Sequence, residues 1–364
     1  MTTEEKLKKY QDWLFKCSAY HMALNIIDID KQTVAPTAGA GYRDERSAFL
    51  AGELFSLETD PEIVELLKDL KDDPKVDAEN KRAIQLYYKQ ALDTLCIPKE
   101  EFVAFEKLCS ESFDAWLLAK SKADYSLFAP YLEKVIEGKK KLYGYRNSNL
   151  SIYNQMLDDF EPGMDEEKYD AFFAALKERL VPLIQKVTKA KQLREDFLAQ
   201  SFPVEEQKKF MEGLLEYLHF DSSWGYQNES EHPFTSWTCE NDCRTTTKYL
   251  ENNVISAILS TVHEVGHAYY EHNINPKYDG MILSEGVSSG MHESQSRLCE
   301  NYLGRTLAFW KYHYPRLQKH FPKQLGEVSL EEFYQAINVS KPSFIRTEAD
   351  ELTYPLHVLI RYEI

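Results

Sequence analysis

The stretch Thr261-Val262-His263-Glu264-Val265-Gly266-His267-Ala268-Tyr269-Tyr270 decides how the chain is interpreted. On an α-helix, residues four apart are offset by only about 40° and lie one turn above each other, so His263 and His267 point the same way. Both imidazoles are therefore placed to bind one metal ion. Glu264 lies about 100° round the helix from His263, outside the ligand row but within reach of a water molecule on the metal. This placement suits a general base.

The flanking sequence supports a helix. Its apolar residues recur at helical spacing and give the helix one side to bury. They are Val254, Ile255, Ile258, Leu259, Val262 and Tyr269.

A second helix, predicted over residues 284–300, offers a third ligand. His-Glu-x-x-His alone also fits a polar helix stripe, and a site closed by protein ligands needs one more donor. Glu285 and Glu293 lie about two turns apart on this helix and face broadly the same way. Either would complete a set of two histidines and one glutamate with a fourth position open for water. The spacing leaves the choice between them open.

A third histidine ligand in the longer pattern H-E-x-x-H-x-x-G-x-x-H is excluded. Tyr270 and Asn273 occupy the positions of its glycine and histidine. His272 is therefore expected at the surface or behind the ligands.

Composition and charge bound the class of protein. With 364 residues, 43% hydrophobic content and 13% aromatics, the chain can bury a large core. The formal charge of -16 argues against a nucleic-acid partner, which needs clustered Lys and Arg. No apolar stretch is long enough to span a bilayer, and the N-terminus lacks a signal-peptide core, so we expect no membrane partner and a cytoplasmic location.

The cysteines do not predict a disulfide framework. They are scattered over the whole chain, so free thiols are expected. Cys239 and Cys243 are four residues apart but lack the second pair that a cysteine metal site needs.

The first two hundred residues predict helices joined by short connections, because they are rich in Leu, Lys, Glu and Ala. A loop is predicted at 28–41, and Asp60-Pro61-Glu62 opens a helix. A break at 161–165 precedes a strongly periodic helix from Glu166. The other predicted helices span 7–27, 42–56, 77–95, 98–121, 125–142 and 204–218.

The character of the chain changes between residues 220 and 249, where Ser, Thr, Trp, Gly and Asn replace the helix formers. Short strands are predicted at 233–237 and 243–249, joined by a turn at 240–242. An edge strand there would be able to bind an extended peptide. The remaining chain predicts helices at 304–320, 329–339 and 351–364 and a brief strand at 343–346, with Ser329 and Glu332 spaced like a capping box. The fold class is mainly α, with a small sheet beside the metal-binding helix.

Five short motifs resemble, in order, those of the M32 family of metallocarboxypeptidases, the group similar to Taq carboxypeptidase. The family's H-P-F motif stands here as His232-Pro233-Phe234, and its D-x-R-x-T motif as Asp242-Cys243-Arg244-Thr245-Thr246. Its zinc motif is His263-Glu264-Val265-Gly266-His267. Its H-E-S-Q motif is His292-Glu293-Ser294-Gln295, and its I-R-x-x-A-D motif is Ile345-Arg346-Thr347-Glu348-Ala349-Asp350.

The resemblance implies that Glu293, and not Glu285, is the third ligand beside His263 and His267, with Glu264 as the catalytic base. Zinc is the implied ion, although such ligands also accept cobalt or manganese. The resemblance further implies a single large helical domain with a deep narrow groove, and a homodimer. It also implies stepwise removal of C-terminal residues, with broad specificity, from peptides that have a free C-terminus.

Substrate-binding residues are expected among the other motifs. An exopeptidase must hold a free carboxylate, and arginine grips one with two parallel hydrogen bonds. Arg346 is preferred for this role over Arg244, which Asp242 is expected to hold in a structural ion pair. His232 is a candidate oxyanion donor, or else a buried structural histidine. Tyr354 is a candidate for a phenol in the groove.

Two alternatives remain, a helical zinc oligopeptidase or endopeptidase, and an inactive metal-binding fragment. Family members continue past the final predicted helix into a segment with a G-x-x-Q-D-x-H-W motif, which this sequence lacks. We therefore expect residues 1–364 to be one peptidase domain without its C-terminal part. Residues 1–200 would form a helical half and residues 201–364 the half with the metal site.

Overall fold

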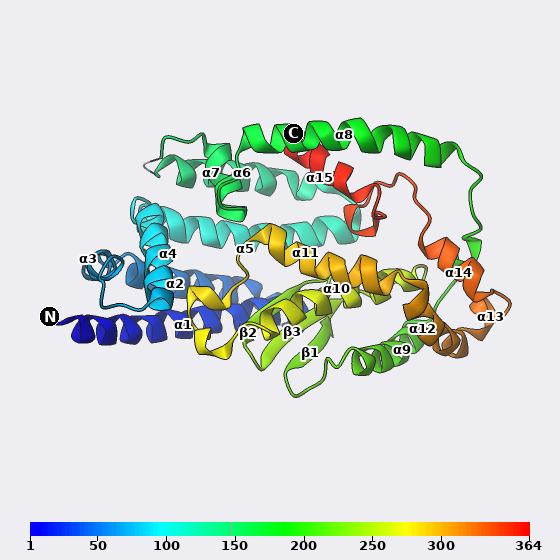
Figure 1. Ribbon diagram of the computed structural model, residues 1–364, viewed down its shortest axis with the longest axis horizontal. Helices are drawn as coiled ribbons and strands as arrows, with labels where there is room; N and C mark the ends of the chain where they lie inside the picture. The colour runs from blue at the N-terminus through cyan, green and yellow to red at the C-terminus, as the bar shows by residue number, and fades with distance from the viewer. Residues whose placement is uncertain (147) are drawn as a thin grey trace. The chain divides into compact units, whose positions relative to one another are not determined.

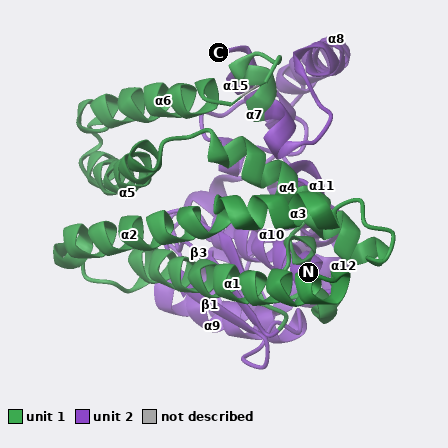
Figure 2. Cartoon of the chain, turned by 90° about the vertical axis from the view of Figure 1, so that its left-hand side faces the viewer, with its two compact units in different colours: residues 1–156, 238–240, 274–287 green, residues 157–237, 241–273, 288–364 purple. Residues whose placement is uncertain are grey.

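The computed structural model describes residues 1–146 and 148–364, which fold into helices and one small sheet (Figure 1). The chain forms two compact units (Figure 2). The first comprises residues 1–156, 238–240 and 274–287, and the second comprises residues 157–237, 241–273 and 288–364. The mainly helical fold predicted from the sequence is confirmed.

The first unit is built from long helices whose starts follow the predicted capping residues. The side chain of Asp60 accepts from the backbone N–H of Glu62, and that of Asp77 accepts from Asn80. Its core includes the fully buried Tyr10 and Leu67. The helices are α1 (Thr3–Thr33), α2 (Ala40–Glu58), α3 (Pro61–Leu70), α4 (Ala78–Leu95), α5 (Lys99–Lys122), α6 (Ala129–Gly144) and the start of α7 (Ile152–Phe160).

The loop predicted at 28–41 is wrong for its first part, because α1 continues to Thr33. Ile29 on this extra turn is buried. The buried ammonium of Lys31 lies 2.9 Å from a carboxylate oxygen of Asp44 and donates to the Ser110 hydroxyl at 2.6 Å. Tertiary packing of this kind extends a helix beyond the point where its sequence signals end.

The second unit holds most of the sheet and the other helices around an aromatic core that includes the fully buried Trp310 and Phe333. The predicted capping box is present, with the Ser329 and Glu332 side chains each bonded to the other's backbone N–H. The helices are α8 (Glu166–Lys189), α9 (Val204–Tyr217), α10 (Val254–His272), α11 (Ser289–Cys299), α12 (Leu307–His320), α13 (Pro322–Leu325), α14 (Leu330–Ile337) and α15 (Tyr354–Glu363).

The sheet has the order β1-β3-β2. The strands β2 (Thr235–Cys239) and β3 (Asp242–Thr247) match the two that the sequence predicted, whereas β1 (Gly225–Glu229) was not predicted. The sequence Gly-Tyr-Gln-Asn-Glu has low strand propensity, and β1 is instead held by parallel pairing to β3. Strand β3 in turn packs on α10, where the Thr247 hydroxyl donates to the Ala257 carbonyl at 3.2 Å.

Helices α10 and α11 lie side by side and approach closely at Gly266 (Figure 1). A Cβ atom at Gly266 would lie 2.8 Å from the backbone Cα of Ser296 and 2.9 Å from Cβ of Cys299. The helix predicted at 284–300 begins only at Ser289, because the Ser288 side chain caps it by accepting from Met291 N–H. A π-helical turn, Glu300–Gly304, continues it.

The strand predicted at 343–346 is wrong. This segment is a loop with exposed Phe344 and Ile345 that ends in a short 3₁₀ turn, Arg346–Glu348. The final helix starts at Tyr354, three residues later than predicted, because the Asp350 carboxylate accepts from the backbone N–H groups of Leu352 and Thr353. Such local side-chain bonds favour a turn over a strand or a helix.

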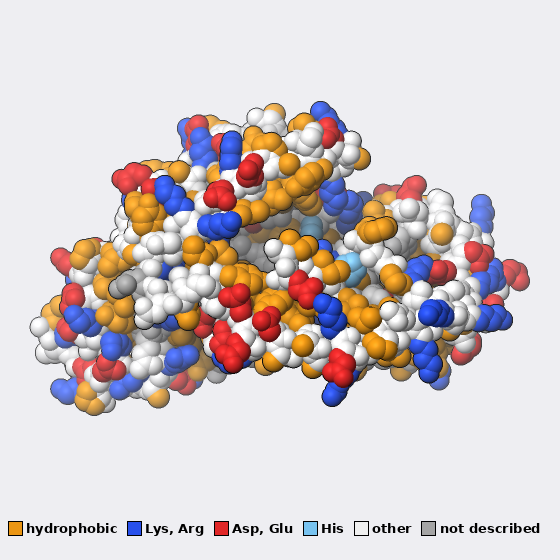
Figure 3. Space-filling model, turned by 90° about the horizontal axis from the view of Figure 1, so that it is seen from above, with side chains coloured by type: hydrophobic (Ala, Val, Ile, Leu, Met, Phe, Trp, Pro, Cys, Tyr) orange, Lys and Arg blue, Asp and Glu red, His pale blue; other side chains and the backbone are white. Residues whose placement is uncertain are grey.

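On the face shown in Figure 3, acidic and basic side chains are interspersed with hydrophobic ones. The six cysteines are free thiols. Within residues 1–146 and 148–364, no helix has both the length and the apolar character needed to cross a membrane.

Replacing Gly266 by alanine should lower the free energy of unfolding by about 1–3 kcal/mol, because the added methyl group meets backbone that cannot give way. The matched control is Gly213→Ala on α9, where nothing lies within 4 Å of the new Cβ and a gain of up to about 1 kcal/mol is expected. Urea unfolding of both variants measures the difference. Equal effects of the two substitutions would contradict close packing at Gly266.

Candidate metal centre

The sequence-predicted ligands His263, His267 and Glu293 come together in the second unit. Helix α10 presents the two histidines one turn apart, and α11 presents Glu293 opposite them. Nε2 of His263 and Nε2 of His267 each lie 3.5 Å from Oε2 of Glu293. One ligand atom from each residue falls within 4.8 Å of the other two.

This spacing fits a small divalent cation. Ligand atoms about 2.1 Å from a shared tetrahedral zinc ion stand about 3.4 Å apart. The two observed nitrogen–oxygen separations of 3.5 Å are close to that value. Two imidazole nitrogens and one carboxylate oxygen are also a ligand set that zinc accepts with a fourth position left open.

A buried carboxylate behind the ligands orients His263. Its Nδ1 lies 2.9 Å from Oε2 of Glu300, which is the first residue of the π-helical turn. Arg297 donates to the same oxygen at 2.9 Å, and Arg305 lies 3.4 Å from the other oxygen. This contact uses the outer ring nitrogen of His263 and leaves Nε2 to face the centre.

The charges around the ligands favour a cation. Burial by itself lowers the pKa of His263, but hydrogen bonds with Glu293 and Glu300 and the charge of Glu264 outweigh it and raise this pKa to about 9. Burial raises the pKa of Glu293, but the two histidines and Arg297 hold this pKa well below its ordinary value. Without a metal, the site thus takes up positive charge as a proton on His263.

Glu264 is buried, with 6% of its surface exposed. Its Oε2 accepts a hydrogen bond of 2.6 Å from the Thr235 hydroxyl, whose oxygen also lies 2.9 Å from the Glu264 carbonyl oxygen. Thr235 lies at the start of β2. The small sheet therefore helps to fix the carboxylate predicted to act as general base.

Tyr354 and Arg346 lie beside the third ligand. The Tyr354 hydroxyl donates to Oε1 of Glu293 at 3.1 Å and accepts from Nη1 of Arg346 at 2.8 Å. The guanidinium carbon of Arg297 lies 3.6 Å from the centre of the Tyr354 ring. Only one phenol group thus separates Arg346 from Glu293.

Arg244 and His232 have other surroundings. Nε and Nη2 of Arg244 each donate to one oxygen of Asp242 at 2.8 Å, so this arginine is held in a bidentate ion pair. His232 is exposed, which excludes the buried structural histidine considered above, and its Nδ1 lies 2.7 Å from the Pro233 carbonyl oxygen.

Glu285 is not on the helix that carries Glu293. Glu285 precedes α11, the helix that was predicted at 284–300, and it belongs to the first unit. His272 stacks on the ring of Trp224, with 4.0 Å between the ring centres.

Sequence reasoning did not identify Glu300, Thr235 or Arg297 as parts of the site. Glu300 follows Glu293 by seven residues, which is two helical turns, and this spacing was the available signal. Thr235 directly follows the H-P-F motif and Arg297 lies two residues after the H-E-S-Q motif, but nothing in their spacing shows what they contact.

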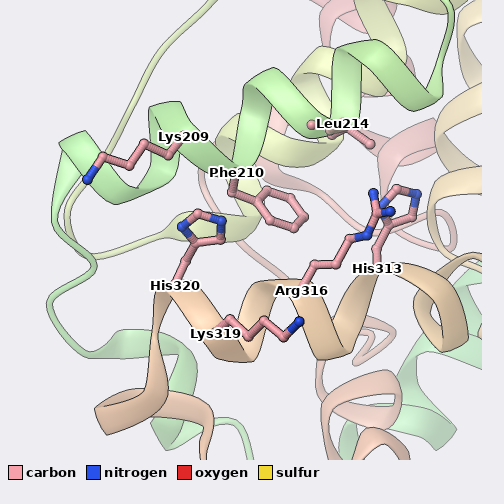
Figure 4. Close-up of a pocket in the computed structure, with 8 residues that line it drawn as sticks. Lys209, Phe210, Leu214, His313, Arg316, Lys319 and His320 are labelled. Carbon is pink, nitrogen blue, oxygen red and sulfur yellow. The ribbon is translucent and has the colours of Figure 1, made fainter.

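A separate cavity of about 160 Å³ lies between α9 and α12 (Figure 4). Lys209, His313, Arg316 and His320 line it together with Phe210 and Leu214. None of these residues belongs to the metal centre. The convergent His and Glu atoms lie at the candidate metal centre and not at this cavity.

Comparisons with known proteins place the chain among carboxypeptidases. It is 40% identical to carboxypeptidase 1 of Bacillus subtilis (strain 168) over 361 residues, which cover 98% of this chain and 72% of the relative. It is 35% identical to thermostable carboxypeptidase 1 of Thermus thermophilus over 351 residues, which cover 92% of this chain and 68% of that protein.

Solved structures give the same result. The crystal structure of BsuCP superimposes with a TM-score of 0.96 at 40% identity. The matched region covers 99% of this chain and 73% of the BsuCP chain. That of the M32 carboxypeptidase from Deinococcus radiodurans R1 gives a TM-score of 0.88 at 32% identity, with 99% of this chain and 72% of its own covered.

The family model for the carboxypeptidase Taq (M32) metallopeptidases matches residues 9–364. Motifs, fold and relatives agree with this match. The chain therefore belongs to the M32 family of metallocarboxypeptidases, hydrolases that act on peptide bonds.

Proposed function

We propose that this chain binds zinc through His263, His267 and Glu293 and removes residues one at a time, with broad specificity, from the C-terminus of peptides. The two Nε2–Oε2 separations of 3.5 Å carry the proposal, since they match the spacing of zinc ligands. The same ligands accept cobalt or manganese, which are the alternative ions. A cytoplasmic homodimer, as the sequence resemblance implies, is part of the same proposal.

When bound, the metal supplies a Lewis acid that polarises the scissile carbonyl and makes a water molecule acidic near neutral pH. Glu264 takes the proton of the attacking water. Its Oε2 is held by Thr235, so Oε1 is the oxygen free to accept that proton. Glu264 then passes the proton to the nitrogen of the leaving amine, which completes cleavage of the peptide bond.

Arg346 binds the C-terminal carboxylate of the substrate. Of its guanidinium nitrogens, Nη1 donates to Tyr354, and no other bond of this group is present among the described residues. Arg244 in contrast spends two donors on Asp242. This difference supports Arg346 as the carboxylate clamp and Arg244 as a structural residue of the sheet.

The first test incubates the zinc-loaded chain with an unblocked peptide and identifies the products by mass spectrometry. We expect a ladder of C-terminal truncations, and a loss of rate of about 10²- to 10⁴-fold in Glu264→Gln with zinc still bound at one equivalent. Glu216→Gln, an exposed glutamate on α9, is the matched control. Internal cuts would favour an endopeptidase, and zinc binding without any product would favour an inactive fragment.

The second test concerns the carboxylate clamp. Arg346→Ala should lower kcat/KM for unblocked peptides by roughly 10- to 100-fold, as expected when a hydrogen-bonded charge partner is lost. The exposed Arg361→Ala on α15 should change it little. If the wild type cleaves C-terminally amidated peptides as fast as unblocked ones, and Arg346→Ala leaves both rates unchanged, the endopeptidase alternative is correct and the clamp is wrong.

The third test uses the pKa of His263. Because this pKa is raised to about 9, the ring is protonated at neutral pH without metal and must lose that proton to bind metal. The apparent zinc affinity should therefore rise by about tenfold per pH unit up to about pH 9 and level off above it. Competition with a chelator, corrected for the chelator's own protonation, measures this slope. In Glu300→Gln the zinc affinity should level off at a lower pH. A zinc affinity that does not change between pH 7 and 8 in the wild type would contradict the assignment of His263 as a protonated ligand.

A further inference from the structure

The second metal-ligating histidine has an unusual outer partner. Nδ1 of His267 lies 2.6 Å from Nδ1 of His292. Nε2 of His292 lies 2.6 Å from Oε1 of Glu271. Helix α10 thus provides both ends of a three-residue chain, and α11 provides its middle residue.

The two short contacts allow one arrangement of hydrogen atoms when His267 binds a metal. The metal takes the lone pair of His267 Nε2, so the ring carries its hydrogen on Nδ1. A contact between two nitrogens needs one hydrogen, so Nδ1 of His292 accepts. His292 must then carry its own hydrogen on Nε2, where it donates to the carboxylate of Glu271. Both hydrogen bonds among these three side chains are therefore donated in the direction from His267 toward Glu271.

Glu271 depends on this contact. It is only 6% exposed, and its other oxygen, Oε2, has no hydrogen-bond partner among the described residues. A buried carboxylate is costly unless it is paired. The bond from His292 is therefore the interaction that holds the carboxylate, and the carboxylate in turn fixes which nitrogen of His292 carries the hydrogen.

We propose that His292 is a positioning residue that, backed by Glu271, fixes the tautomer and ring orientation of His267 so that Nε2 faces the metal. The proposal rests on the proposed metal site and deepens it. The two ligating histidines are then held differently. Glu300 contacts His263 directly, whereas Glu271 acts on His267 through a second imidazole.

Three substitutions at His292 separate positioning from packing. Asparagine has a polar atom at the δ position, where its oxygen can accept from His267, but nothing at the ε position. Glutamine has its amide at the ε position, where it can donate to Glu271, but only carbon at the δ position. Alanine has neither group.

Zinc affinity, measured by competition with a chelator, should fall by about 10- to 100-fold in His292→Ala and in His292→Gln. His292→Asn should recover most of this loss, because it restores the acceptor for His267. Equal affinities of the Asn and Gln variants, or a wild-type affinity in His292→Ala, would overturn the proposal. Ala and Asn both leave the Glu271 carboxylate without its donor, so a higher affinity in Asn than in Gln can come only from the restored acceptor for His267, and this comparison decides the matter.

A spectroscopic signature gives a second readout that packing alone would not move. In the zinc-loaded wild type, the Nδ1–H of His267 should give a slowly exchanging imidazole signal in ¹H–¹⁵N spectra. The signal should persist in His292→Asn and vanish in His292→Gln. Persistence of the signal in both variants would overturn the proposed positioning role of His292.

The matched control is His313→Asn on α12. His313 is 1% exposed and packs against aromatic rings of the second unit, so its loss should lower stability without changing zinc affinity. If the wild-type chain itself binds no zinc, the proposed function fails. If it binds zinc and the His292 variants do not differ in zinc affinity, only the positioning role of His292 fails.

Discussion

The close approach of α10 and α11 at Gly266 is the constraint on which the site depends. One helix carries both imidazoles, and the other carries the carboxylate that faces them. A side chain at Gly266 would meet the backbone at Ser296, so the helices can touch only because this position has none. The distance between the axes then sets the 3.5 Å separations that a metal ion needs.

Electrostatic balance is the second requirement of this arrangement. Glu264, Glu271 and Glu300 are all buried close to the ligand helices. Each has a specific donor, a threonine hydroxyl, an imidazole or a pair of arginines. A buried carboxylate is costly unless it has such a partner. The donors therefore allow three carboxylates to be buried around the centre, an arrangement that favours a cation there.

Much of the site could be predicted from the sequence because it obeys helical spacing. His263 and His267 are one turn apart, and the apolar residues that bury α10 repeat with the same period. The choice of Glu293 over Glu285 could not come from spacing. It depends on where α11 starts, which a capping bond of Ser288 decides. The outer partners could not be predicted either, since Glu300 and His292 acquire their roles only when the two helices are packed together.

The errors in the fold have a common origin. Strand β1 has a sequence poor in strand formers and exists because β3 pairs with it. The extra turn of α1 exists because Lys31 finds Asp44 and Ser110. The segment 343–346 has the apolar and β-branched content of a strand, but it is a loop with exposed Phe344 and Ile345. In each case a tertiary contact, or its absence, outweighed local propensity.

Asp350 links the two ends of the segment that precedes α15. Its carboxylate accepts from the hydroxyls of Ser340 and Thr353 and from the backbone N–H groups of Lys341 and Leu352. One side chain thus ties together both ends of the loop that contains Arg346 and leads into Tyr354. Local bonds of this kind hold a turn in one conformation. Arg346 and Tyr354 therefore share one support, and loss of the Asp350 carboxylate would disturb both residues beside Glu293 together.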